Sequence, residues 1–184
     1  MRWRKPGGSL ELPEHFRPPL RKSSWLIRDL MQSVCRRRPQ RLGCRPALKI
    51  SFNLFAKQFH DEGIVKDVRN IFLNSAIQFS QVMFELTELD SIENFGEVRQ
   101  MIAALQALGV RIAIDDVGTG HSALSYMLKL GVDIIKIDKM FVDAIGTDRN
   151  STIIVETLVG LAHNKRMDVV AEGVENFEQV MHLH

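Results

Sequence analysis

Acidic side chains and one lysine follow or interrupt apolar runs at three places in the second half of the chain. Asp115 and Asp116 end the run at 112–114, and a glycine-rich turn follows them. Lys136 lies within a second apolar run, and Glu172 ends a third. Carboxylate oxygens are hard donors that suit Mg²⁺ or Mn²⁺. The residue types therefore indicate chemistry that depends on divalent cations, with a lysine nearby as a fixed positive charge.

The order of the predicted elements indicates how these residues are brought together. Apolar, strand-like segments cover 48–53, 81–86, 110–114, 133–137 and 167–171. Helical periodicity lies between and after them, over 61–74, 91–108, 122–130, 150–164 and 177–183. Such alternation predicts right-handed βαβ units and a parallel sheet. We therefore predict an α/β fold of the TIM-barrel type, in which the carboxyl ends of the strands gather the acidic residues on one face.

The length of the chain bears on whether that barrel closes. The chain has 184 residues, of which 45% are hydrophobic, enough for one globular core. A complete eight-stranded barrel typically takes about 250 residues, and at least about 200. We therefore predict an incomplete or open barrel. Because an open barrel leaves strand edges unpaired, we also predict a homo-oligomer that forms through those edges.

Charge is distributed unevenly along the chain. Residues 1–49 contain 13 Lys and Arg, 3 Asp and Glu, and all six prolines, although the formal net charge of the whole chain is +2. We predict a single domain over 1–184, with a basic, proline-rich part at 1–47 and the barrel core at 48–184. The simplest interpretation of the basic part is a solvated surface that complements the acidic core. We do not expect nucleic-acid binding, because no aromatic stacking pattern accompanies the basic run at 36–38.

Neither cysteine chemistry nor a membrane segment is indicated. Cys35 and Cys44 do not have the spacing of a metal or redox motif, so we interpret them as free thiols. No apolar run approaches the roughly 20 residues needed to cross a bilayer, and no signal-peptide pattern opens the chain. These features predict a cytoplasmic domain.

Four motifs in the chain resemble the ordered motifs of a known family. They are Glu85-Leu86-Thr87-Glu88, Asp115-Asp116-Val117-Gly118-Thr119-Gly120, Lys136-Ile137-Asp138 and Ala171-Glu172-Gly173-Val174-Glu175. Their order and spacing resemble those of the EAL domain, which hydrolyses the bacterial second messenger cyclic di-GMP. The resemblance is nearly continuous from Leu48 to Met181 and extends more loosely to Arg2-Trp3. It therefore implies a bacterial, cytoplasmic phosphodiesterase domain that converts cyclic di-GMP to linear pGpG with Mg²⁺ or Mn²⁺.

The resemblance also implies individual roles. The positions that match metal ligands of a two-ion site are Asn53, Glu85, Asp115, Asp116 and Glu172. Lys136 matches the lysine that the family uses in catalysis. Asp115 and Asp116 point in different directions from an extended backbone, so one of them can bridge two ions while the other faces the second ion or the attacking water, and Asp116 is also a candidate catalytic residue. Arg2 matches an arginine that contacts the substrate phosphate. Glu88 and Glu175 match residues that hold the loop at 118–122 in place.

Some features depart from the family pattern and keep alternatives open. Val117 stands where the family usually has Phe, and the resemblance places the Glu-Ala-Leu triplet of the family before Arg2, outside this sequence. An inactive EAL-like module that binds cyclic di-GMP or a protein partner is one alternative. A different metal-dependent barrel enzyme that abstracts a proton with Lys136 is another. Taken singly, Lys136 could instead be a structural ion-pair partner, and Asp116 or Asp138 could cap a helix.

Overall fold

A parallel sheet of five strands forms the centre of the described molecule. The structure, a computed structural model, describes residues 2–5, 8–11, 31–32, 49–55, 58, 63–87, 92, 94–117 and 123–183. The strands are β3 (Ile50–Phe55), β4 (Val82–Thr87), β5 (Arg111–Val117), β6 (Ile134–Ile137) and β7 (Asp168–Ala171), and they neighbour one another in that order. Every neighbouring pair is parallel. Their carboxyl ends therefore lie along one edge of the sheet, as the sequence predicted.

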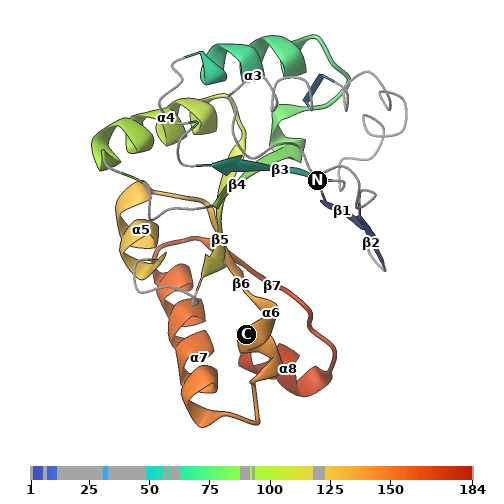
Figure 1. Cartoon of the computed structure of the whole chain (residues 1–184), viewed down its shortest axis with the longest axis vertical. Coiled ribbons are helices and arrows are strands. Elements are labelled where there is room, and N and C mark those ends of the chain that lie inside the picture. The colour runs from blue at the N-terminus through green and yellow to red at the C-terminus, as the bar shows by residue number, and fades with distance from the viewer. Residues whose placement is uncertain are drawn as a thin grey trace.

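Helices connect the strands, and the longer ones lie along one side of the curved sheet (Figure 1). The longer ones are α3 (Ile64–Leu73), α4 (Phe95–Ala107), α5 (Ala123–Leu130) and α7 (Arg149–Asn164). Three short elements are η2 (Phe79–Gln81), α6 (Lys139–Asp143) and α8 (Phe177–His182). The longer helices and the helix at the end of the chain were predicted from the sequence, but η2 and α6 were not. The α/β class and the TIM-barrel-like order of elements are confirmed.

The amino-terminal strands form a separate hairpin. β1 (Arg2–Lys5) pairs antiparallel with β2 (Gly8–Glu11), and these two strands make up a second sheet. In the sequence, the prolines and glycines of residues 1–22 predict the end of a strand at Arg2-Trp3 followed by a loop, so the second strand was not predicted. Helical spacing in the sequence also predicts a helix at 25–35. That segment lies mostly outside the described residues, and within it residues 31–32 are described and helical.

Side-chain burial alternates along the first strands of the large sheet. In β3 and β4 the buried residues face the helices and contribute to the main core, and they are Ile50, Phe52, Leu54, Val82, Phe84 and Leu86. The residues between them are only half-buried or are exposed. Strands of a closed parallel barrel are buried on both faces, so this alternation is typical of a sheet with one open face. Within the described residues the sheet does not close, and β3 and β7 are its outer strands.

The start of α4 differs from the prediction. We expected a helix from residue 91, but α4 begins at Phe95. The side chain of Asn94 accepts hydrogen bonds from the backbone N–H groups of Gly96, at 3.0 Å, and Glu97, at 3.4 Å. The helix therefore begins where a capping side chain satisfies the first free N–H groups.

The buried face of α7 also differs from the prediction. From the helical spacing we expected Ile153, Ile154, Leu158 and Leu161 to face inward. Leu158 is buried and Leu161 packs against the core, but Ile153 and Ile154 are 49% and 42% exposed. The buried residues of this helix are Val155, Leu158, Val159 and Ala162. Their spacing follows one helical stripe, and Ile153 and Ile154 lie outside that stripe.

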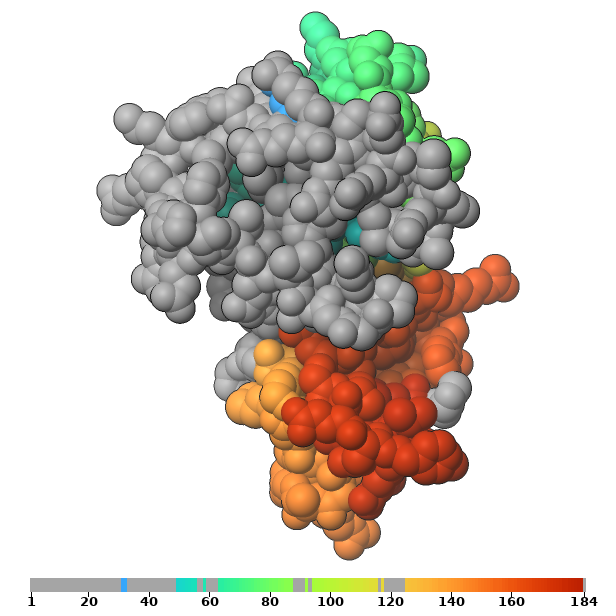
Figure 2. All heavy atoms as spheres, turned by 90° about the vertical axis from the view of Figure 1, so that its right-hand side faces the viewer, coloured from blue at the N-terminus to red at the C-terminus, as the bar shows by residue number. Residues whose placement is uncertain are grey.

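The carboxyl-terminal elements form one end of the molecule. Figure 2 shows the segment from α6 to α8 in orange and red below α3, which is green.

Among the described residues, no helix combines the length and the apolar character that a membrane span requires.

Candidate active site

The ammonium group of Lys136 contacts three carboxylates near the carboxyl ends of the strands. Its Nζ lies 3.1 Å from Oε2 of Glu85 on β4, 2.5 Å from Oδ1 of Asp115 on β5, and 3.0 Å from Oε1 of Glu172, the residue after β7. Four successive strands therefore each contribute one charged side chain at or near their carboxyl end. We call these four residues the carboxylate–lysine cluster. The convergence that the sequence predicted for them is present.

The charge of Lys136 is maintained although its side chain is buried. The residue is 4% exposed. Burial alone would lower its pKa, but the hydrogen bond to Asp115, the negative charges of Glu85 and Asp115, and the hydrogen bond to Glu172 raise the pKa more. The pKa of Lys136 therefore lies above its ordinary value of 10.5, and the side chain is a cation at neutral pH.

A β-bulge in β5 coincides with the two adjacent aspartates. The register advances from residue 114 to 117 in β5 while it advances from 135 to 137 in β6. One additional residue of β5 is therefore accommodated at Asp115 and Asp116. Bulges are common beside active sites because they change the direction of a side chain without ending the sheet. Here the carboxylate of Asp115 reaches Lys136 on the neighbouring strand.

Asn53, which the sequence indicated as a further ligand, lies beside the cluster. Asn53 is paired in register with Glu85 across β3 and β4. Paired residues of neighbouring strands project from the same face of the sheet. The side chain of Asn53 is exposed, so it is accessible from the open face.

Several of the predicted residues cannot be placed as side chains. Glu88 lies outside the described residues, as does the loop at 118–122. For Arg2 and Asp116 only the backbone position in β1 and β5 is described. Glu175 pairs with Lys139 rather than with any described residue of the cluster. The roles that the resemblance implies for these residues stay predictions.

A cavity of about 690 Å³ lies along the open face of the sheet. Glu85, Lys136 and Glu172 line its end at the carboxyl edge, whereas Arg111 and Asp168 line it near the amino ends of β5 and β7. The cluster is therefore reached through a space large enough for a small molecule.

The donor set of the cluster fits a divalent cation in its chemistry. Three carboxylates and one ammonium group carry a formal charge of −2, and all the donors are hard oxygens. Within the described part of the chain, however, no group of three Asp, Glu, His or Cys side chains is arranged to hold a metal ion. The physical reason is visible in the distances, because the ammonium group of Lys136 lies between the carboxylates. The three carboxylates thus surround a positive charge, and in this structure that charge is the ammonium group of Lys136.

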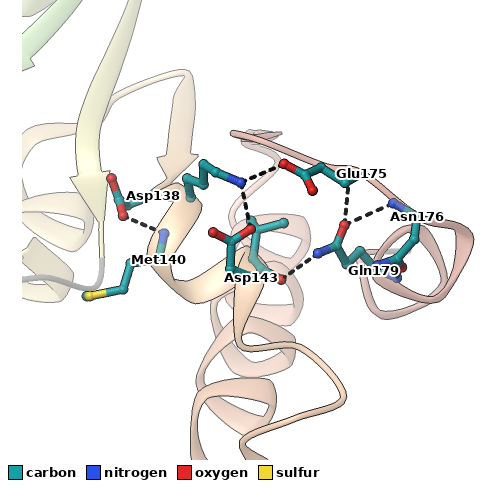
Figure 3. A network of polar contacts seen from close by, with 8 residues as sticks. Asp138, Met140, Asp143, Glu175, Asn176 and Gln179 are labelled. Atoms are coloured by element: carbon teal, nitrogen blue, oxygen red, sulfur yellow. Dashed lines mark hydrogen bonds and ion pairs between the residues drawn. The ribbon is translucent and has the colours of Figure 1, made fainter.

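A second polar network is formed by the residues that follow Lys136 and those that follow Glu172 in the sequence (Figure 3). Lys139 on α6 contacts Asp143 at 2.7 Å and Glu175 at 2.9 Å. Asp138 accepts a hydrogen bond of 2.7 Å from the backbone N–H of Met140 and caps α6. The alternative interpretation of Asp138 as a helix cap is therefore confirmed.

Sequence reasoning missed both Lys139 and Gln179 in this network. The sequence carries no signal for the pairing of Lys139 with Glu175, because the two residues are 36 apart, although its pairing with Asp143 has the i,i+4 spacing of a helical ion pair. For Gln179 there was a signal. Asn176 and Gln179 have the spacing of a capping box, and the structure contains that capping box at the start of α8.

The chain matches one family model over its whole length. The model is that of the EAL domain, and it matches residues 1–184. The chain is 32% identical over 183 residues to the bifunctional diguanylate cyclase/cyclic di-GMP phosphodiesterase MucR of Pseudomonas aeruginosa, which covers 97% of this chain and 27% of MucR. It is 37% identical over 136 residues to the probable cyclic di-GMP phosphodiesterase PdeN of Escherichia coli, covering 74% of this chain and 26% of PdeN. The chain thus spans about a quarter of the length of these curated relatives.

Solved structures of EAL proteins have the same fold. The EAL domain of Mycobacterium smegmatis DcpA matches with a TM-score of 0.73 at 31% identity, over 86% of this chain and 70% of that one. The phosphodiesterase of P. aeruginosa MucR in complex with c-di-GMP matches with a TM-score of 0.71 at 32% identity, over 86% and 69%. A manganese/cy-diGMP complex of Klebsiella pneumoniae BlrP1 matches with a TM-score of 0.65 at 31% identity, over 74% and 35%.

Proposed function

The chain belongs to the EAL domain family, and from this membership and the carboxylate–lysine cluster we propose that it is a cyclic di-GMP phosphodiesterase domain. The proposed reaction opens the cyclic dinucleotide to linear pGpG with Mg²⁺ or Mn²⁺. The observation that carries the proposal is the convergence of Glu85, Asp115 and Glu172 on Lys136 beside an open cavity. Relatives in complexes with c-di-GMP and with manganese support the choice of ligand and metal.

Each residue of the cluster has a task that follows from its chemistry. Glu85, Asp115 and Glu172, with Asn53 beside them, would hold divalent cations through oxygen atoms. Bound in pairs, such ions activate a water molecule and neutralise charge on a phosphate. Lys136 keeps its proton at neutral pH, so it would act as a fixed positive charge towards the phosphate and not as a general base. We propose that Asp116 contacts the second ion or the attacking water. We propose that Arg2 contacts the substrate phosphate.

The proposal is tested by incubating the purified chain with cyclic di-GMP and Mn²⁺ or Mg²⁺ and separating the nucleotides by chromatography. We expect linear pGpG to accumulate with metal and not with EDTA. The matched control is Asp115→Asn, which is nearly the same size but removes one charge from the cluster. If no linear product forms with either metal, the proposal of catalysis is wrong for this chain.

A second candidate function is a non-catalytic module that binds cyclic di-GMP or a protein partner. Two observations favour it. The ammonium group of Lys136 lies between the three carboxylates, and among the described residues no group of three ligands is arranged to hold a metal ion. Calorimetry with cyclic di-GMP in Ca²⁺ separates the candidates. Binding without turnover in Mn²⁺ supports the module, and absence of binding leaves only a protein partner.

Self-association through the outer strands remains part of the proposal. β3 and β7 are the outer strands of the described sheet, and exposed strand edges favour pairing with other chains. Sedimentation velocity over a range of concentrations tests it. A monomer at the highest concentration would rule out association through these strands.

A further inference from the structure

Two chain segments meet at three points that begin at the carboxylate–lysine cluster. Nζ of Lys136 contacts Oε1 of Glu172 at 3.0 Å. Three residues further along each segment, Nζ of Lys139 contacts Oε1 of Glu175 at 2.9 Å. The third contact joins the next turn of α6 to α8, through the side chain of Gln179. The cluster is therefore continuous with a row of contacts that runs away from it.

Gln179 makes the last contact in this row, and its side chain is buried. Its Nε2 donates a hydrogen bond of 3.1 Å to the backbone carbonyl of Val142 on α6. Its Oε1 accepts from the backbone N–H groups of Glu175, at 2.7 Å, and Asn176, at 3.1 Å (Figure 3). The residue is 5% exposed. One carboxamide thus joins the loop that carries Glu172 to the helix that follows Lys136.

The second contact of the row is exposed, whereas the first, between Lys136 and Glu172, and the third, made by Gln179, are largely buried. The side chains of Lys139 and Glu175 are 48% and 70% exposed, and ion pairs in water contribute little because water screens them. The hydrogen bonds of Gln179 are shielded, and losing one partner there leaves backbone groups without a replacement from water. Outside the cluster itself, Gln179 therefore makes the shielded contact that holds the loop to α6.

Close packing between the segments makes the cluster sensitive to that position. Gly173, which follows Glu172, lies so near the stem of Lys139 that a Cβ atom on it would be 2.6 Å from Lys139 Cγ and Cδ. The backbone N–H of Glu172 donates to the carbonyl of Ile137 at 3.0 Å. The loop is therefore packed tightly against the segment that carries Lys136 and α6. If the loop moved away from α6, the carboxylate of Glu172 would move away from Lys136.

We propose that Gln179 is a positioning residue that fixes the 172–176 loop to α6 and thereby sets the place of the Glu172 carboxylate in the cluster. The inference rests on the proposed function in so far as Glu172 is taken as a metal ligand. Residues that orient metal ligands typically change metal affinity or activity by about 10–100-fold when they are replaced.

The test compares Gln179→Met with Gln81→Met. Gln81 is a matched control because it is also a buried glutamine, 2% exposed, in a capping box, but it lies at the amino end of β4, away from the cluster. Both variants should lower the melting temperature. We expect Gln179→Met to weaken Mn²⁺ binding, measured by calorimetry, by about 10-fold or more, and Gln81→Met to leave it unchanged. Equal Mn²⁺ affinities in all three proteins, or equal losses in both variants, would overturn the proposal.

A second variant covers the case in which Gln179→Met does not fold. Gln179→Glu keeps an oxygen that accepts from Glu175 and Asn176, but it replaces the donor to the Val142 carbonyl with another acceptor. It therefore breaks the link to α6 and keeps the cap of α8. Weaker Mn²⁺ binding by this variant supports the proposal, and wild-type affinity contradicts it.

Hydrogen exchange separates this inference from the proposed function. In metal-free protein, the amides at 172–176 should exchange faster in Gln179→Met than in wild type and in Gln81→Met. If the wild type binds no Mn²⁺, the proposed function is wrong, and faster exchange at 172–176 alone still supports the positioning role. Unchanged exchange in this loop would contradict the role whatever the metal does.

Discussion

The side chains of Lys136 and Asp115 form the shortest contact of the cluster, with 2.5 Å between Nζ and Oδ1. They come from neighbouring parallel strands and are 21 residues apart in the sequence. Asp115 reaches Lys136 from a bulge in β5, and Lys136 is enclosed by strands on both sides. The contact thus joins the acidic end of β5 to a buried cation. Changing either residue should therefore alter both the stability of the fold and the binding of metal.

Asp115→Asn should separate metal binding from folding. The amide keeps the size of the side chain but removes the negative charge, so Mn²⁺ binding should be lost or strongly weakened. Folding should weaken by about 1.5–3 kcal/mol, the typical contribution of a hydrogen bond to a charged group, reduced by the relief of repulsion among the carboxylates. Thermal denaturation with and without Mn²⁺ measures both effects. An equal metal-induced shift in wild type and variant would remove Asp115 from the metal site.

Lys136→Met should destabilise the metal-free chain and make its stability depend on metal. Removing the cation leaves three partly buried carboxylates facing one another, and breaking a buried ion pair from one side typically costs about 3–5 kcal/mol. Mn²⁺ should restore more stability to this variant than to wild type, because the ion replaces the lost charge. Lys66→Met, an exposed substitution on α3, is the control and should change stability by no more than about 0.5 kcal/mol. A Lys136→Met protein as stable as this control without metal would contradict the prediction.

Gly173→Ala should be more harmful than Gly131→Ala. Both glycines have positive φ, at +71° and +69°, so either substitution should cost about 1–2 kcal/mol for the backbone alone. Only Gly173 has a neighbour in the way, since its Cβ would lie 2.6 Å from the stem of Lys139, while nothing lies within 4 Å at Gly131. Chemical denaturation should show the larger loss for Gly173→Ala, and calorimetry should show weaker Mn²⁺ binding in this variant alone. Equal stabilities would mean that Lys139 moves aside without cost.

Asp148 should make the stability of α7 depend on pH. Its side chain caps the helix and accepts hydrogen bonds from Asn150 and Ser151. The hydroxyl and backbone N–H of Ser151, and then the N–H of Asn150, hold its pKa below the ordinary value of 3.8. A lowered pKa of an acid means that its contribution is present above the unfolded pKa and is lost as pH falls through the folded one.

We therefore expect Asp148→Ala to lower the melting temperature at neutral pH, and we expect the difference from wild type to shrink as the pH falls below 3.8 and through the lower pKa of the folded state. Asp148→Asn is the control, because Asn caps helices about as well and does not titrate. It should stay close to wild type at neutral pH. A difference between wild type and Asp148→Ala that persists in strong acid would show that the charge of Asp148 does not stabilise the helix.

The sequence by itself determined the order of the strands and the residues that end them. Apolar runs with periods of two and 3.6 are local properties, so the strands that carry Glu85, Asp115, Lys136 and Glu172 could be located within a few residues. The parallel arrangement followed from the alternation of strands and helices, and it implied that these side chains meet on one edge. The family could also be recognised, because its motifs are short and ordered.

Only the tertiary structure decided which partners these residues have. The ammonium group of Lys136 lies among three carboxylates because the strand register places it there, and register depends on contacts between distant segments. The bulge at Asp115 and Asp116 is a property of two strands together, so neither strand indicates it alone. For the same reason the link from Gln179 to Val142 could not be predicted. A hydrogen bond between residues 37 apart depends on how two short helices pack, and no local pattern specifies that packing.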